Sequence, residues 1–167
     1  MSVDVSGKSL PDLRRIVINH RLQNRTDLPL CRAASDEIER RRGGPLNLWT
    51  TLAAIRAAAE QHHFLTYLDV AKANGVTWSQ ARVRMTPHLN ELLDYAIDRS
   101  WPLVTALVVD AAGVAEGKMS ETALKGFTKS ADEREKFPGG DEAEFLQQEQ
   151  GLVFAWADKE RGRDLRA

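Results

Sequence analysis

The sequence predicts a mainly α-helical protein with a small β-hairpin. Two capping-box sequences, at residues 66–69 and 77–80, flank Gly75, a residue that suits the end of a helix. Residues 103–109 are apolar and rich in valine, and a turn sequence follows them at residues 110–113. Elsewhere apolar residues recur at intervals of three and four, which is typical of helices that pack one face.

The N-terminal segment, residues 1–44, is expected to form two helices. Ser9 is suited to cap the first, which should end near Asn24, and residues 26–29 begin the second. Arg40-Arg41-Arg42 precedes Gly43-Gly44 at its end. Arginines in a last turn complement the helix dipole, so this cluster indicates a helix C-terminus rather than a binding site.

The central segment, residues 45–118, contains the feature with most bearing on function. A helix over residues 47–61 is followed by a short strand at Phe64-Leu65 and by the two capped helices, the second with a restart or kink at Pro87. The central segment is expected to end with a strand over residues 103–109 and a shorter return strand over residues 114–118. Helix, strand, helix, turn, helix, strand and wing is the order of a winged helix-turn-helix, which we expect at this centre.

The C-terminal segment, residues 119–167, should add two helices that pack on the core. Ser120 and Asp141 are suited to cap them, and a mobile loop separates them around residues 132–140. The tail from Lys159 onward has little apolar surface, so we expect it to be frayed. The three segments together are expected to form one compact domain.

Composition indicates a soluble protein. Apolar residues make up 43% of the 167 residues and charged residues 28%. No apolar run could span a bilayer, the first residues do not resemble a signal peptide, and the single cysteine, Cys31, cannot form an internal disulfide. These features predict a cytoplasmic protein without membrane contact.

The sequence does not settle whether this is an enzyme, and it favours a protein without catalysis. It contains no phosphate-binding glycine loop, nucleophile elbow or His-x-x-x-His pair. His62 and His63 are adjacent and therefore point about 100° apart on a helix, which is unsuited to shared metal binding. Glu91, Asp94 and Asp98 fit a solvated helix face better than an acid–base site. We therefore predict no catalytic residue, no bound metal and no cofactor.

Nucleic-acid binding is the better-supported chemistry. The second helix of a helix-turn-helix lies in the major groove, and its first turns meet the base edges. Here Gln80, Arg82 and Arg84 would contact the groove, Thr77 and Ser79 would contact phosphates, and Lys118 would lie beside the wing. Trp78 would stack on bases if exposed, although we expect it to pack in the core. Residues 64–118 contain 5 Lys/Arg and 6 Asp/Glu, so this segment is not basic overall.

Residues 64–118 resemble the winged-helix domain of O6-alkylguanine alkyltransferases and alkyltransferase-like proteins. The resemblance rests on Thr66-Tyr67-Leu68-Asp69-Val70-Ala71, Gly75, Arg82 and the apolar residues 103–109. The family has Tyr-Gly where this chain has Tyr67-Leu68, and the reactive Pro-Cys-His-Arg motif is absent. The resemblance therefore implies the scaffold and not alkyl transfer. The whole chain also resembles a family of uncharacterised bacterial proteins, which implies no site.

The sequence thus predicts a non-catalytic accessory or regulatory protein that binds nucleic acid, with double-stranded DNA as the partner. The alternative is a protein-interaction module, such as a regulator or inhibitor subunit, that reuses the scaffold without binding DNA. Near-neutral charge and one-sided apolar stripes at both ends of the chain motivate this alternative. Neither hypothesis specifies the oligomeric state.

Overall fold

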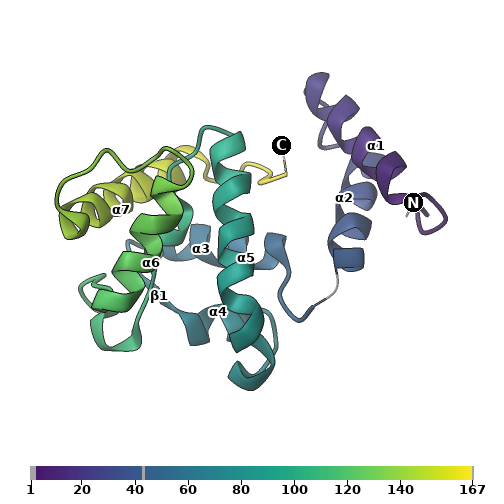
Figure 1. Ribbon diagram of the computed structural model, residues 1–167. Coiled ribbons are helices and arrows are strands. Elements are labelled where there is room, and N and C mark those ends of the chain that lie inside the picture. The colour runs from purple at the N-terminus through teal and green to yellow at the C-terminus, as the bar shows by residue number, and fades with distance from the viewer. Residues whose placement is uncertain (1–2, 43, 167) are drawn as a thin grey trace.

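A computed structural model describes residues 3–42 and 44–166, which contain seven α-helices and a two-stranded parallel sheet (Figure 1). The elements in chain order are α1 (Leu10–Leu22), α2 (Pro29–Arg42), α3 (Leu48–Glu60), β1 (Leu65–Thr66), α4 (Tyr67–Ala73), α5 (Trp78–Asp98), η1 (Val104–Leu107), β2 (Val108–Val109), η2 (Ala111–Gly113), α6 (Glu121–Asp132) and α7 (Glu142–Lys159). The elements η1 and η2 are short 3-10 helices. The prediction of a mainly helical fold is confirmed. Across the described residues, no helix combines the length and the apolar character that crossing a membrane requires.

Side chains cap most of the helices at the positions that the sequence indicated. Four of these residues each accept a hydrogen bond from the backbone N–H three positions later: Ser9, Asn47, Ser120 and Asp141. Thr66 and Thr77 begin α4 and α5 with the two predicted capping boxes. Each cap satisfies a backbone donor that the first helical turn would otherwise leave unpaired, which stabilises the helix by about 1 kcal/mol.

The sheet differs from the predicted β-hairpin. β1 and β2 pair in parallel, with Leu65 opposite Val108, and α4 and α5 form the connection between them. Residues 104–107 form η1 instead of a strand, and all four are buried. Residues 114–118 form turns, closed by a hydrogen bond of 2.9 Å from the Lys118 N–H to the Gly113 carbonyl. The hairpin prediction is therefore wrong: η1 packs against α3, α5 and α7, so helices cover the apolar run in place of a partner strand.

The main core lies between α3, α5 and α7, beside the sheet. Leu52 and Ile55 of α3, Leu92 of α5 and Val153 of α7 are fully buried in it. Burying a side chain of this size stabilises the fold by about 1.5–3 kcal/mol. α5 passes through Pro87 without a break in helical structure. A second apolar cluster joins α5 to α6 and α7, so α5 is packed along most of its length.

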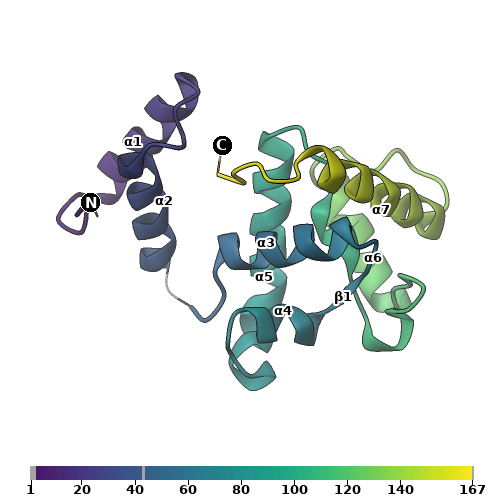
Figure 2. The ribbon, with the colours of Figure 1, turned by 180° about the vertical axis from the view of Figure 1, so that it is seen from behind.

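The hairpin of α1 and α2 stands to one side of this body and has a small apolar cluster of its own. Figures 1 and 2 both show the C-terminal residues between this hairpin and α5. Arg32 of α2 pairs with Asp164 at 2.7 Å, and Arg166 pairs with Asp36 at 2.7 Å. Leu165 is buried, and its carbonyl accepts a hydrogen bond from the Tyr95 hydroxyl at 2.6 Å. The expectation of a frayed tail is wrong, because the tail links the hairpin to the body.

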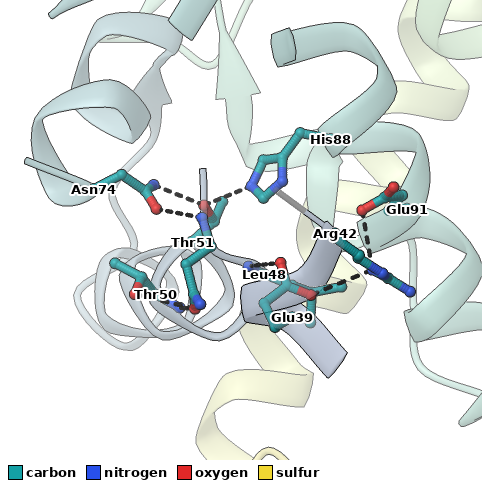
Figure 3. A network of polar contacts seen from close by, with 9 residues as sticks. Glu39, Arg42, Leu48, Thr50, Thr51, Asn74, His88 and Glu91 are labelled. Carbon is teal, nitrogen blue, oxygen red and sulfur yellow. Dashed lines mark hydrogen bonds and ion pairs between the residues drawn. The ribbon is translucent and has the colours of Figure 1, made fainter. Parts of the chain in front are cut away.

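A buried hydrogen-bond network holds the turn between α4 and α5 against α3 (Figure 3). The Asn74 carboxamide accepts from the Asn47 N–H at 2.7 Å, and donates to Thr51 Oγ1 and to the Val70 carbonyl, both at 2.9 Å. Thr51 Oγ1 in turn lies 2.7 Å from His88 Nε2 on α5. Thr51 and His88 are buried, so these polar groups depend on one another for hydrogen bonds. The network thus fixes α4 and α5 relative to α3.

Charged groups lie close to the imidazole of His88. Arg42 at the end of α2 pairs with Glu91 at 3.0 Å, and Figure 3 shows this pair beside His88. Burial, together with the positive charges of Arg42 and Arg84, lowers the pKa of His88 to about 4. The ring is therefore uncharged at neutral pH.

We expect mild acid to destabilise the fold through His88. The folded-state pKa of about 4 lies below the ordinary value of 6.5, so the unfolded chain binds more protons between these values. Stability from the neutral ring is complete above pH 6.5 and is lost as the pH falls toward 4, a total of about 3 kcal/mol. Urea unfolding at pH 7 and pH 5 measures the difference. The His88→Gln variant should be less stable than wild type at pH 7, but it should lose less stability between pH 7 and pH 5. Equal losses of stability in wild type and in the variant would contradict the role of His88 in the acid sensitivity.

We also expect Gly117→Ala to destabilise the protein. Gly117 has φ +71°, and a Cβ atom at this position would overlap the ring of Phe64. A strained backbone and a steric overlap each cost about 1–3 kcal/mol, so we expect the free energy of unfolding to fall by about 2 kcal/mol or more. The matched control is Gly151→Ala within α7, where no atom lies within 4 Å of the added methyl. That control should gain up to about 1 kcal/mol from higher helix propensity, measured by the same urea titration.

Candidate nucleic-acid interface and adjoining cavity

α4 and α5 form two successive helices joined by a tight turn. α4 ends at Ala73, and Thr77 caps α5 four residues later. Gly75 within this turn has φ +69°, a conformation that a side chain would strain. Asn74 caps α4 and anchors the turn to α3 through the network described above. The turn therefore has one conformation, which directs the first half of α5 outward.

The residues predicted to contact nucleic acid are all exposed. They are Thr77, Ser79, Gln80, Arg82, Arg84 and Lys118. Positions two apart on a helix differ by about 200°, so Arg82 and Arg84 lie on opposite flanks of α5. Arg82 faces a cavity beside α6, whereas Arg84 packs against Gly44 and lies near His88. Ser79, Gln80 and Val83 are the exposed residues between these flanks.

The capping box already uses part of the predicted contact set. Gln80 Oε1 accepts from the Thr77 N–H at 2.9 Å and from the Thr77 hydroxyl at 3.2 Å. Thr77 Oγ1 accepts from the Gln80 N–H at 3.3 Å. The Gln80 side-chain NH₂ group is therefore the part of this carboxamide that is free to donate outward. Bidentate pairing of Gln80 with adenine would require this cap to open.

Arg82 and Arg84 carry charges that are not neutralised locally. Most arginines of the described residues form ion pairs, as Arg134 does with Asp94 at 2.6 Å, but neither Arg82 nor Arg84 forms one in these residues. Free guanidinium groups are the side chains best suited to bind phosphate. The first half of α5 thus offers two such groups despite the near-neutral charge of the segment.

A cavity of about 510 Å³ adjoins this half of α5. Tyr67 of α4 and Trp78 and Arg82 of α5 line it on one side, and residues of α6 line the other. The α6 side is made of small residues one turn apart, Ala123, Gly126 and Ser130, which leaves room between the helices. Half of the remaining lining is apolar: Met85, Leu89, Leu93, Val108, Met119 and Phe127. The cavity is therefore the size of a small-ligand site and has aromatic rings at α4 and α5.

Several polar groups line the cavity. The buried Thr105 hydroxyl lacks a hydrogen-bond partner within the described residues. Asp110 accepts from the Ser120 N–H at 2.8 Å, and Ser130 donates to Asn90 at 3.1 Å. Burial raises the pKa of the Tyr67 hydroxyl, and the charge of Asp110 adds to this, so the phenol stays protonated at neutral pH. These groups can orient a bound polar molecule by hydrogen bonding.

Sequence reasoning missed the cavity and two of its residues. Trp78 was expected to pack, but its side chain is 42% exposed and also lines the cavity. Thr105 was assigned only to a strand. His88 was recognised as a histidine but not as a buried member of the network that positions α5.

The histidines and acidic residues do not gather into a metal-binding group. Among residues 3–42 and 44–166, no set of three His, Cys, Asp or Glu side chains is arranged to hold a metal ion. His62 stacks on Phe154, with ring centroids 4.7 Å apart, and thus packs on the surface of α7. Cys31 is buried, and burial raises the pKa of its thiol, which makes it a poor nucleophile.

The resemblance to alkyltransferase-like proteins remains a prediction. Comparison of the chain with protein-family models, curated proteins and solved structures finds no match in any of the three sets. The functional assignment therefore rests on the geometry of α4, α5 and the adjoining cavity.

Proposed function

We propose that this protein binds double-stranded DNA, without catalysis, through the exposed first half of α5. The observation that carries the proposal is the pair of guanidinium groups without an ion pair in the described residues, Arg82 and Arg84, on the two flanks of the exposed side of α5. A helix in a groove meets the phosphates of both strands along its flanks, and the residues between them face the base edges. Ser79 and the Gln80 NH₂ group would occupy this central position, while Lys118 would contact phosphate beyond the cavity.

The cavity suggests how such a protein would select its DNA. Enzymes that act on a single base extrude it from the duplex and hold it between aromatic or apolar side chains. Tyr67 and Trp78 offer such rings at the edge of the cavity, and Arg82 lies beside them. Thr105, Asn90 and Ser130 offer hydrogen bonds to the edge of a heterocyclic ring. We therefore extend the proposal to an extruded nucleotide held in this cavity.

Docking to a protein is the second candidate, and a specific observation favours it. Leu68 of α4 and Trp78 and Val83 of α5 are among the exposed large apolar side chains of the described residues, and Val83 is 75% exposed. Three apolar residues on the same two helices suit contact with another protein. The absence of any salt-sensitive binding to duplex DNA would leave docking as the better assignment.

Arg82→Ala combined with Arg84→Ala should weaken binding to duplex DNA by about tenfold or more at low salt, because each guanidinium that contacts phosphate releases counterions. The slope of log affinity against log salt concentration should become shallower by about 2. Fluorescence anisotropy of a labelled duplex measures both quantities. The matched control is Arg14→Ala with Arg25→Ala, two exposed arginines of the N-terminal hairpin that make the same charge change. Equal losses in the two double variants would show that only total charge matters and would contradict the assignment to α5.

The cavity is tested by filling it. Wild-type protein should prefer a duplex with a central mismatch over a fully paired duplex by about tenfold or more, because a mismatched base costs less to extrude. Gly126→Leu should abolish this preference and retain binding to the paired duplex, since the space around Gly126 accepts a side chain and the arginines are untouched. Gly126→Ala adds a single methyl group and should retain the preference. A wild-type protein without any preference would overturn the extruded-nucleotide proposal and leave DNA binding in place.

A further inference from the structure

A second cavity lies at the opposite end of α5, apart from the candidate interface. It has a volume of about 790 Å³ and is bounded by residues 97–103, one face of α7 and the start of the C-terminal tail. In Figure 1 this region lies at the upper edge, where α5 ends near α7. The two cavities are separate in that they share no lining residue.

Arg99 lines this cavity, and its charged side chain indicates that the cavity binds an anion. Its guanidinium lies 3.4 Å above the centre of the Tyr95 ring, and its Nε atom is buried without a hydrogen-bond partner. Burial lowers the pKa of Arg99 to about 10, so the group is still charged at neutral pH. Within the described residues Arg99 has no carboxylate in an ion pair. Charged groups removed from water are normally paired, and here the aromatic contact replaces the counter-ion only in part.

The other charges around the cavity also leave an excess of positive charge. Lys136 and Lys159 line it, and neither forms an ion pair with a described residue. The acidic groups that line it are engaged by partners in the same wall. Glu149 accepts from the Leu103 N–H at 3.0 Å, and Glu160 pairs with Arg163 at 3.4 Å. Two ammonium groups without an ion pair in the described residues and the partly buried guanidinium of Arg99 thus line one cavity.

Aromatic side chains form part of the same wall. Trp101 and Trp156 both line the cavity, with ring centroids 5.1 Å apart. The indole Nε1 of Trp156 is buried and, like Arg99 Nε, has no hydrogen-bond partner among the described residues. The cavity therefore combines positive charge with an aromatic surface. Its volume lies within the range typical of small-molecule sites.

We propose that this cavity binds a small phosphorylated molecule that carries a planar ring, of the nucleoside monophosphate class. The phosphate pairs with Arg99 and Lys159, and Lys136 adds charge at the rim. The ring packs on Trp101. This site is independent of the DNA-binding proposal, because it shares no residue with the first half of α5 or the cavity beside it.

Isothermal titration calorimetry with adenosine monophosphate, inorganic phosphate and adenosine tests the site. We expect wild-type protein to bind the monophosphate more tightly than phosphate alone, and adenosine weakly. Arg99→Gln and Lys159→Gln should each weaken binding of the monophosphate tenfold or more. Lys159 is at the exposed end of α7, so Lys159→Gln tests the site even if Arg99→Gln disturbs the fold. The matched control, Lys125→Gln on α6, makes the same charge change away from the cavity and should bind as wild type does.

Any of three outcomes would overturn the proposal. The first is that millimolar adenosine monophosphate gives no heat of binding. The second is that Arg99→Gln, Lys159→Gln and Lys125→Gln all bind the monophosphate equally well, and the third is that adenosine binds as tightly as its monophosphate. Titration of duplex DNA into the protein–monophosphate complex separates the two sources of phosphate. If the monophosphate stays bound, the result supports a small-molecule site. If duplex DNA displaces it from wild-type protein and Lys159→Gln binds duplex DNA more weakly, the site would instead be assigned to a DNA backbone phosphate.

Discussion

The buried contact from Asn74 through Thr51 to His88 is the constraint on which the rest of the central fold depends. Each of these side chains comes from a different part of the chain: the turn after α4, the second turn of α3 and the middle of α5. Buried polar groups are costly when unpaired, so the three elements are stable together only in the arrangement that completes all the hydrogen bonds. Apolar packing alone would tolerate small rotations of α5, whereas this network does not.

The orientation of α5 in turn creates both the exposed surface and the cavity beside it. Its second half is held by Leu92, Leu93 and Ala96 in the two apolar clusters, and its first half buries only Ala81 and Met85 and leaves its other side exposed. The ion pair between Asp94 and Arg134 fixes α6 alongside, where its small residues leave the space next to Arg82 open. Packing contacts outside the cavity thus determine the positions of α5 and α6. These positions place the charge of Arg82, the aromatic rings and the cavity next to one another.

The sequence predicted the helices well because their signals are local. Capping residues and apolar stripes act over four to eight positions, so Thr66, Thr77, Ser120 and Asp141 could each be interpreted without knowledge of the fold. The apolar run at residues 103–109 has no period, and only the surrounding helices determine that most of it forms η1. The exposure of Arg82 and Arg84 followed from the helix pattern. The cavity could not be predicted from the sequence, because it depends on where α6 packs. The hydrogen-bond partners of Asn74 and His88 could not be predicted either, because they lie 23 and 37 residues away in the sequence.

The position of the C-terminal tail fixes the order in which the molecule can be assembled during translation. The α1–α2 hairpin is synthesised before α3 to α7 and can close its own apolar cluster before they are complete. Its ion pairs to Asp164 and Arg166 must wait until every other helix has been synthesised. For most of synthesis the hairpin is therefore a tethered unit beside a growing body, and its final placement is among the last events of folding.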